Sequence, residues 1–229
     1  MSLAGEVFII TGASRGIGRA IAERVASDGA SVVINYLSNS RAADEVVDVE
    51  KLVSATVNKS SKIDVVIPNA GIMPMRDLES STEADFDDVF NLNVKSPVFL
   101  VQKAVPHMPT DGSGRVIFIS TGLNTSTNVV PGYLLYVPSK GAVDQLTRVL
   151  SKDLGKKNIT VNAIAPGPTG TDLFFEGKSE QLLSVFKSHR PLNRLGTPEE
   201  IADVAAFVAG DGSRWISGQT IRVNRANMV

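Results

Sequence analysis

The chain of 229 residues contains no cysteine, which excludes disulfide bonds, thiolate nucleophiles and cysteine-based metal sites. It contains only two histidines, His107 and His189, and neither has a neighbouring residue pattern that would bind a metal. We therefore expect a protein without a metal ion.

The sequence also lacks a strong excess of charge and any long apolar run. The formal net charge is -1, so neither a nucleic-acid-binding surface nor a surface for anionic membranes is expected. No apolar run approaches the ~20 residues that span a bilayer, and no basic segment followed by an apolar stretch opens the chain. The composition, 43% hydrophobic and 21% charged, predicts a cytoplasmic globular enzyme or binding protein.

A short apolar run at residues 7–10 is followed by a glycine-rich turn and then by residues 19–26 with helical character. The apolar run is typical of a buried parallel strand. Gly12 permits the tight turn, Gly16 lets a phosphate approach the backbone, and Gly18 lets the helix pack closely on the strand. Because free N–H groups and the helix dipole bind a diphosphate, this segment predicts a dinucleotide site. The loop residues expected to form it are Gly12, Ser14, Arg15, Gly16, Ile17 and Gly18.

The end of the second predicted strand, residues 31–35, indicates which dinucleotide binds. An acidic residue at this position would hold the ribose 2′-hydroxyl and repel a 2′-phosphate. Here the strand ends with the neutral residues Asn35 and Tyr36, while Arg15 in the glycine loop and Arg41 supply positive charge. This combination favours NADPH over NADH.

Apolar runs and helical patterns alternate along the rest of the chain, which predicts a single α/β domain with a doubly wound, mostly parallel sheet in three α/β/α layers. An amphipathic stretch, residues 172–190, is expected to form a flap over the cleft. Further strands are expected at 63–67, 114–119, 159–164 and 218–223, and helices at 41–58, 82–108, 138–152 and 197–210.

Tyr136 and Lys140 stand four residues apart, which places them on one face of a helix, one turn from each other. A nearby ammonium favours phenolate, so we expect Lys140 to lower a tyrosine pKa that starts near ~10. Such a tyrosine donates or accepts a proton at near-neutral pH. Tyr133 cannot form the same pair, because Val137 stands four residues after it.

Several motifs occur together in a particular order. They are residues 11–18 (TGASRGIG), 69–71 (NAG), Asn93, 136–140 (YVPSK), 161–167 (VNAIAPG) and Gly218. In this order the chain resembles a compact, single-domain short-chain dehydrogenase/reductase. The context of residues 132–136 is most similar to the NADPH-using, ketone-reducing branch, which includes 3-oxoacyl-carrier reductases and fungal naphthol reductases. The resemblance implies NADP(H) as cofactor, a small ketone or alcohol as substrate, and a homodimer or homotetramer assembled through helices 86–108 and 138–152.

The resemblance also implies roles for individual residues. Tyr136 would protonate the substrate carbonyl, Lys140 would lower the tyrosine pKa and bind the nicotinamide ribose, and Asn93 would hold a water in a proton relay. The adenosine and ribose side would be lined by Asn69, Ala70 and Gly71, and the nicotinamide by Ile164, Pro166, Gly167, Thr169 and Thr171.

A hydroxyl at the end of strand 114–119 would hold the substrate carbonyl. Alignment of this strand with the family places Thr121 at that position, whereas counting back from Tyr136 leads nearer to Gly122, with Ser120 adjacent. Thr121 and Ser120 both remain candidates, since either hydroxyl makes the required hydrogen bond.

The chain departs from the family in length. Only 27 residues separate Asn35 from Ile63, too few for the usual helix and third strand. We expect a segment to be absent between Val47 and Asp48, either as a true deletion or as residues missing from the structure. A true deletion would leave a new sheet edge and a weaker adenine pocket. In addition, Arg225 and Ala226 stand where glycines are common.

The residues together predict an NADPH-dependent carbonyl reductase. Two alternatives remain: a catalytically weak dinucleotide-binding sensor on the same fold, and an NAD-dependent alcohol dehydrogenase.

Overall fold

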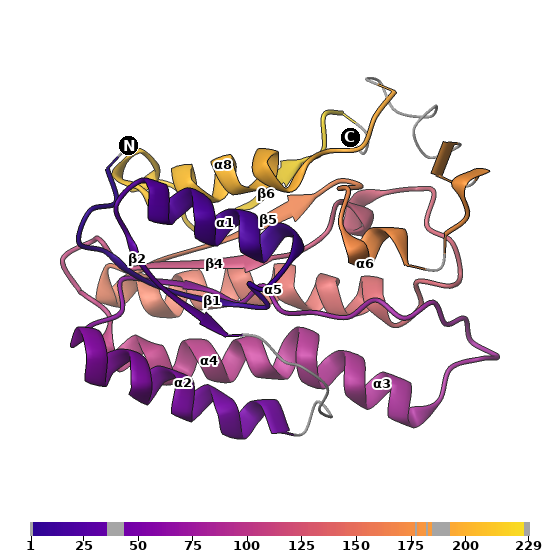
Figure 1. Ribbon diagram of the computed structural model, residues 1–229. Helices are drawn as coiled ribbons and strands as arrows, with labels where there is room; N and C mark the ends of the chain where they lie inside the picture. The colour runs from indigo at the N-terminus through magenta and orange to yellow at the C-terminus, as the bar shows by residue number, and fades with distance from the viewer. Residues whose placement is uncertain (1, 36–43, 177, 182, 185–192, 227–229) are drawn as a thin grey trace.

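The computed structural model of the chain describes residues 2–35, 44–176, 178–181, 183–184 and 193–226. In these ranges the predicted strands form one sheet in the order β2-β1-β3-β4-β5-β6, with every neighbouring pair parallel (Figure 1). The doubly wound sheet predicted from the sequence is confirmed. The strands are β1 (Val7–Thr11), β2 (Ser31–Asn35), β3 (Val65–Ile67), β4 (Arg115–Ile119), β5 (Thr160–Pro166) and β6 (Thr220–Val223).

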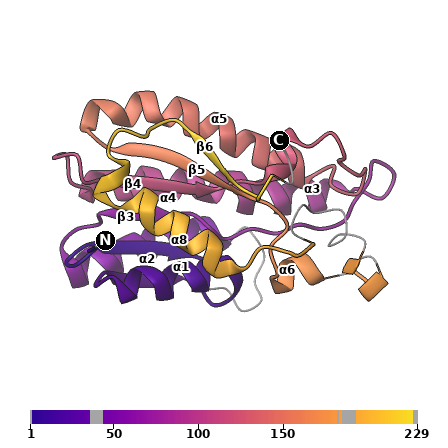
Figure 2. The ribbon, with the colours of Figure 1, turned by 90° about the horizontal axis from the view of Figure 1, so that it is seen from above.

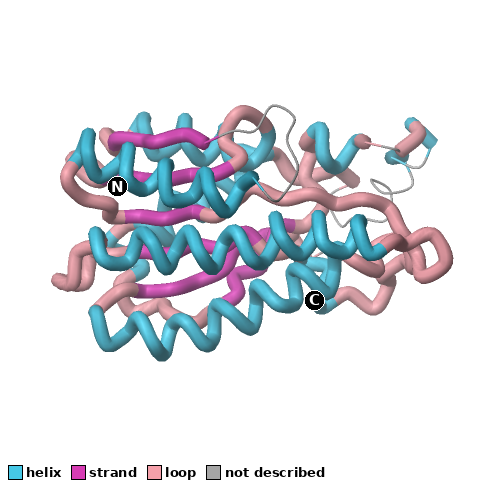
Figure 3. Tube along the Cα trace, turned by 90° about the horizontal axis from the view of Figure 1, so that it is seen from below, coloured by secondary structure: helices cyan, strands magenta, loops and turns pink. Residues whose placement is uncertain are grey.

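Helices cover both faces of the sheet, as expected for a parallel sheet whose strands are apolar on both sides. Helices α1 and α8 lie over one face (Figure 2), and α2, α4 and α5 lie over the other (Figure 3). The three-layer prediction is therefore confirmed. The helices are α1 (Gly16–Ser27), α2 (Asp44–Ser60), α3 (Glu83–Phe90), α4 (Ser96–Ala104), α5 (Tyr136–Leu154), α6 (Asp172–Phe175) and α8 (Pro198–Ala209).

Two hydrophobic clusters fill the space between the layers. Successive strand residues point to opposite faces, so Phe8 packs with the α1 and α8 cluster, while its neighbour Ile9 packs with the α2, α4 and α5 cluster. Phe118, with 0% exposure, belongs to the second cluster. Truncating a buried phenylalanine to alanine typically costs about 3–5 kcal/mol, so these strands hold the site above them firmly.

The helical region predicted at residues 82–108 is interrupted near its middle. Helix α3 begins with a capping box in which Thr82 accepts a hydrogen bond from the Asp85 N–H. A π-helical turn, Asn91–Lys95, then precedes α4. Asn93 lies inside this turn with 1% exposure. Such turns are frequently found at functional sites.

The short spacing between Asn35 and Ile63 corresponds to the helix α2 and to an edge position for β2. Val47 and Asp48 lie inside the continuous helix α2, so the hypothesis of residues missing between them from the structure is wrong. Within the described ranges, β2 pairs only with β1, so a third strand beyond it is absent and β2 forms the edge of the sheet. The predicted new sheet edge is confirmed.

The last described residues also account for the departure from glycine. Arg225 and Ala226 have φ angles of 47° and 59°, in the left-handed region that favours glycine. An ion pair of 3.2 Å joins Arg225 to Glu200 at the start of α8.

None of the helices in the described ranges has the length and apolar character required to cross a membrane.

Candidate active site

A cavity of about 530 Å³ opens where the strands end. In an open α/β sheet, ligands bind at the carboxyl ends of the strands, near the point where the strand order reverses; here that point lies between β1 and β3. The structure brings together at this cavity the predicted residues Gly12, Ser14, Arg15, Gly16, Ile17, Asn35, Asn69, Ala70, Gly71, Ser120, Thr121, Tyr136, Lys140, Pro166, Gly167, Thr169 and Thr171. Gly18, Asn93 and Ile164 do not line it, and Tyr36 and Arg41 lie outside the described residues.

The glycine loop leaves the start of α1 open toward the cavity. Arg15 is the N-cap residue but makes no side-chain capping hydrogen bond, and the first turn of α1 contains no acidic residue. Gly12 has a φ of 63°, and a Cβ there would stand 2.8 Å from the Ala70 backbone. The free N–H groups, the helix dipole and the Arg15 guanidinium together fit a diphosphate.

Asn69 ties β1 to β3 at the edge of the cavity. Its side-chain amide donates to the carbonyl oxygens of Thr11 and Gly12, at 2.9 and 3.1 Å. Gly18 makes this packing possible, because a Cβ at that position would stand 2.4 Å from the Asn69 side chain. Gly18 is thus a packing residue beneath the loop.

Tyr136 and Lys140 lie in the first turns of α5 and both face the cavity, as their spacing predicts. The Lys140 ammonium lies 6.0 Å from the centroid of the Tyr136 ring and donates a hydrogen bond of 2.8 Å to the Ile119 carbonyl. Lys140 is 5% exposed, whereas Tyr136 is partly exposed.

Burial governs the protonation of this pair. Burial raises the pKa of Tyr136 to about 12, and a side-chain hydrogen bond with Thr121 opposes the rise. Burial lowers the pKa of Lys140 to about 8. The prediction that Lys140 lowers the tyrosine pKa is therefore wrong for this structure, because desolvation of the phenol dominates and the ammonium is turned toward Ile119.

The structure distinguishes the two candidate hydroxyls after β4. Thr121 lies close enough to Tyr136 to lower the pKa of its phenol. Its hydroxyl also caps the short 3-10 helix that follows it, accepting from the Leu123 N–H at 3.3 Å. Ser120 instead accepts from the Asn124 amide at 3.3 Å and stands 3.5 Å from the Lys140 carbonyl oxygen. Thr121 is thus the hydroxyl beside Tyr136, and Ser120 ties the strand to its neighbours.

Asn93 lies behind the cavity wall, where its side-chain amide is fully engaged. The amide oxygen accepts from the Ile72 N–H at 3.0 Å, and the amide nitrogen donates to the Ile72 carbonyl and to the Ser139 hydroxyl at 3.0 and 3.1 Å. A Cβ on Gly71 would meet the Asn93 oxygen at 3.1 Å and the Lys140 nitrogen at 3.6 Å. Asn93 therefore holds the loop after β3 against α5, close to Lys140.

The sequence missed most of the wall around the open half of the cavity. Tyr133 had been noted only for lacking a lysine partner, and Leu173 and Phe174 belong to the predicted flap, residues 172–190. Much of that flap lies outside the described residues. As the flap prediction implies, Asp172, Leu173 and Phe174 line the cavity. The missed lining residues are Ile72, Met73, Leu92, Ile119, Leu123, Ser126, Asn128, Val130, Tyr133 and Pro168.

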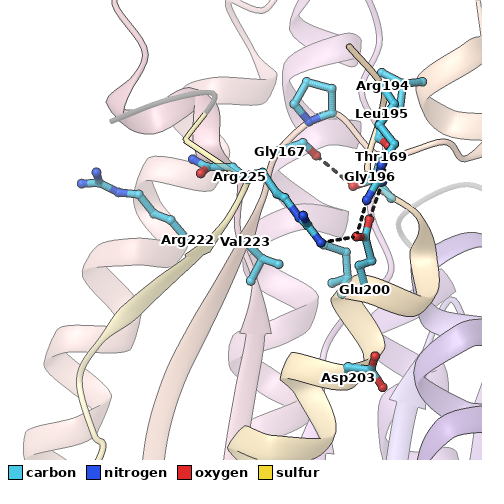
Figure 4. Close-up of a pocket in the computed structure, with 13 residues that line it drawn as sticks. Gly167, Thr169, Arg194, Leu195, Gly196, Glu200, Asp203, Arg222, Val223 and Arg225 are labelled. Atoms are coloured by element: carbon cyan, nitrogen blue, oxygen red, sulfur yellow. Dashed lines mark hydrogen bonds and ion pairs between the residues drawn. The ribbon is translucent and has the colours of Figure 1, made fainter. Parts of the chain in front are cut away.

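A second cavity, of about 420 Å³, lies on the other side of the loop 167–169 (Figure 4). Figure 4 shows the carboxylate of Glu200 between Arg225 and the segment that carries Arg194. The Arg194 hydrogen bonds lower the pKa of Glu200 to about 2, so this carboxylate stays charged. In the same segment, the Gly196 N–H donates to the Pro168 carbonyl at 2.9 Å. These contacts fix the loop that lines the first cavity.

Within the described ranges, no group of His, Asp and Glu side chains is arranged to hold a metal ion. The chemistry available at the first cavity is therefore that of Tyr136, Lys140 and Thr121 beside an anion-binding helix start. This arrangement fits a redox dinucleotide in one half of the cavity and a carbonyl or alcohol in the other.

Comparison with known proteins leads to the same chemistry. A family model described as enoyl-(acyl carrier protein) reductase matches residues 12–225. A short-chain type dehydrogenase/reductase from Picea abies is 35% identical, with 97% of this chain and 92% of the relative covered. That match runs over 251 positions, more than the 229 residues of this chain, so the relative has residues that this chain lacks.

Two further proteins are similar to this chain, one in sequence and one in structure. A hydroxynaphthalene reductase from Aspergillus fumigatus is 35% identical, with 96% of this chain and 91% of the relative covered. The crystal structure of a blue fluorescent protein from a metagenomic library, in complex with NADPH, superimposes with a TM-score of 0.92 at 30% identity and covers 100% of both chains. From its sequence, its sheet and its site, the chain belongs to the short-chain dehydrogenase/reductase family and is an oxidoreductase that acts on CH–OH or C=O groups.

Proposed function

We propose that the protein is an NADPH-dependent carbonyl reductase that converts a ketone to an alcohol. The observation that carries this proposal is that the hydroxyl groups of Thr121 and Tyr136 line one cavity together with Lys140 and the open start of α1. Two such hydroxyls can donate hydrogen bonds to one carbonyl oxygen, and that of Tyr136 can transfer its proton.

The dinucleotide would lie along the glycine loop, with its diphosphate at the start of α1 and its nicotinamide beside residues 166–171. Gly12 and Gly16 leave the space that this approach requires, since each has a positive φ and no side chain. When bound, the nicotinamide supplies the hydride. The protein positions the nicotinamide and the ketone, and it supplies the proton.

Tyr136 would act as the general acid. Its raised pKa keeps the phenol protonated at neutral pH, and its proton passes to the carbonyl oxygen as negative charge develops there. The Thr121 hydroxyl would donate a second hydrogen bond to the same oxygen and stabilise the developing charge. Lys140 would hold the ribose hydroxyls with an ammonium that already donates to Ile119.

Asn93 would act through its backbone in any proton relay. Both N–H groups of its side-chain amide are used by Ile72 and Ser139, and the amide oxygen already accepts from the Ile72 N–H. The π-helical turn changes the backbone hydrogen bonding around Asn93. We therefore assign the water-holding role to its main-chain carbonyl, close to Lys140.

NADPH rather than NADH is favoured by the neutral Asn35 at the end of β2 and by Arg15, both of which line the cavity. The neighbouring structure from the metagenomic library contains NADPH, which supports the same preference.

A homodimer or homotetramer is favoured by apolar side chains left exposed on the expected contact helices, with Phe86 47% and Val149 65% exposed. Light scattering after gel filtration tests the assembly.

The test of the function follows oxidation of NADPH and NADH with a panel of diones, naphthol-type ketones and 3-oxoacyl thioesters, for the wild type and Tyr136→Phe. We expect NADPH-selective turnover that Tyr136→Phe lowers by about 10²- to 10⁴-fold, with dinucleotide affinity retained. Binding of NADPH without turnover of any carbonyl would identify a sensor instead. A preference for NAD with alcohols would identify an alcohol dehydrogenase.

A further inference from the structure

The hydroxyl of Tyr133 is a polar group that the proposed mechanism does not use. The residue is 7% exposed and lines the first cavity. Its burial raises the pKa of the phenol. Within the described part of the chain this hydroxyl makes no hydrogen bond, yet its oxygen is not among the atoms sealed inside the protein. It therefore has unused hydrogen-bonding capacity that only a molecule in the cavity would satisfy.

The backbone fixes the direction of this side chain. The Val137 N–H donates to the Tyr133 carbonyl at 3.0 Å, so the segment that carries Tyr133 is tied to the first turn of α5. On the other side, the Arg76 N–H donates to the Gly132 carbonyl at 2.8 Å. The rings of Tyr133 and Tyr136 lie 6.3 Å apart between centroids, tilted by 54°.

Many of the side chains that line the cavity with Tyr133 are apolar. Its hydroxyl would therefore discriminate between ligands that carry a matching polar atom and ligands that do not. A buried group built to hydrogen-bond a ligand rejects ligands that lack the matching atom, whereas apolar contacts discriminate weakly. The apolar side chains that line the same cavity include Ile72, Met73, Leu92, Leu123, Val130, Leu173 and Phe174.

We propose that Tyr133 is a substrate-positioning residue whose hydroxyl binds a second oxygen of the substrate, next to the carbonyl that reacts at Tyr136. The preferred substrates are then ring ketones that carry an additional hydroxyl or carbonyl group. This proposal rests on the proposed reductase function and narrows its substrate class.

The kinetic test compares 1-tetralone with its monohydroxylated isomers, so that every ring position of the second oxygen is sampled. We expect the best hydroxylated isomer to exceed 1-tetralone by about 10-fold in kcat/KM, the value of one good neutral hydrogen bond. Tyr133→Phe should bring this ratio close to one. The control is Thr127→Val, which removes an exposed hydroxyl that does not line the cavity and should preserve the ratio.

Two kinetic outcomes would overturn the proposal. One is a wild-type ratio that Tyr133→Phe leaves unchanged. The other is an equal loss of kcat/KM by Tyr133→Phe for 1-tetralone and every hydroxylated isomer, which would give Tyr133 a purely structural role.

A binding measurement separates this proposal from the proposed function. Naphthol and the naphthalenediols resemble such substrates but are not reduced, and their affinity for the protein with NADPH is measured by fluorescence titration. We expect the best naphthalenediol to bind about 10-fold more tightly than naphthol, and Tyr133→Phe to abolish the difference. Absence of turnover with this preference intact would refute only the reductase. Turnover without the preference would refute only the role of Tyr133.

Discussion

The ammonium of Lys140 donates a hydrogen bond to the main-chain carbonyl of Ile119, 2.8 Å away, at the end of a strand buried in the centre of the sheet. The contact holds the cation close to Tyr136 but directs it toward the backbone. Because burial disfavours the ammonium, the pKa of Lys140 falls to about 8. The charge of this residue is therefore lost just above neutral pH.

This relationship predicts how dinucleotide affinity depends on pH. If a ribose hydroxyl accepts a hydrogen bond from the ammonium, the dinucleotide binds the protonated lysine more tightly than the neutral one. Binding of the dinucleotide should therefore raise the pKa of Lys140. Affinity should be greatest below about pH 8 and fall several-fold toward about pH 9.5, with net proton uptake on binding in this window. Calorimetry in two buffers of different ionisation enthalpy measures the uptake.

Lys140→Met is the matched variant for the affinity measurement, since it keeps most of the side-chain volume and removes the charge. It should bind the dinucleotide more weakly and without the pH dependence. Proton uptake that persists in Lys140→Met would assign the effect to another group.

The contact between Thr121 and Tyr136 predicts unequal roles for the two neighbouring hydroxyls. Thr121→Val should lower kcat/KM by about 10²- to 10³-fold, because it removes a donor to the developing oxyanion. Thr121→Ser should stay within a few-fold of the wild type. Ser120→Ala should cost less than Thr121→Val, since the Ser120 hydroxyl bonds Asn124. Steady-state kinetics with one ketone decides the order, and a larger loss for Ser120→Ala would reverse the assignment.

Short-range patterns made much of this site predictable from the sequence. The glycine loop and the four-residue spacing of Tyr136 and Lys140 each depend on one local element, and the structure places both at the cavity. The missing strand also follows from a residue count between Asn35 and Ile63.

The features that the sequence did not reveal depend on packing between distant segments. The pKa of Tyr136 rises because burial in the folded protein removes water from the phenol. Ser120 and Thr121 are adjacent, so only the direction in which the strand end turns decides which of them meets Tyr136. The free hydroxyl of Tyr133 can likewise be recognised only in the folded structure, where the residues that line the cavity come together.

The end of β2 predicts how the cofactor preference is changed. Asn35→Asp places a carboxylate at the cavity, where it would hold the 2′-hydroxyl of NADH and repel the 2′-phosphate of NADPH. The ratio of kcat/KM for NADPH over NADH should fall by about 10- to 100-fold, the range of one short-range charge interaction. Gln145→Glu, on the exposed face of α5, adds the same charge away from the cavity and should leave the ratio unchanged. An unchanged ratio in Asn35→Asp would remove Asn35 from cofactor selection.

The open edge at β2 predicts a site of aggregation. Ile34 is 48% exposed on a strand that, within the described ranges, has a partner on one side only. Unpaired edge strands with exposed apolar residues recruit other chains, and lysine is a common natural block. Ile34→Lys should lower light scattering during heating and change the free energy of unfolding by less than about 0.5 kcal/mol. Val33→Lys is the contrast, because Val33 packs against the core and its replacement should destabilise the protein. Equal scattering by Ile34→Lys and the wild type would contradict the role of this edge.

Glu6, at the amino end of β1 and away from the cavity, predicts a stability that depends on pH. Burial, followed by the charge of Asp64, raises its pKa from 4.5 to about 7, and one of its carboxylate oxygens is buried without a partner. Between these two pH values the folded protein holds this proton more firmly than the unfolded chain does. The free energy of unfolding therefore falls as the pH rises through this window, and the loss is complete above about pH 7.

Glu6→Gln removes the charge, so it should be close to neutral at pH 4.5 and stabilising at pH 8. Because Glu6 is only half-buried and its charge is partly screened by solvent, we expect a gain of about 1 kcal/mol. For a chain of this size that gain corresponds to a rise in Tm of about 2–4 °C. The control Glu79→Gln, on an exposed turn, should leave Tm unchanged at both pH values. An equal gain at pH 4.5 and pH 8 would trace the effect to packing of the amide, because the carboxylate charge acts only where Glu6 is ionised.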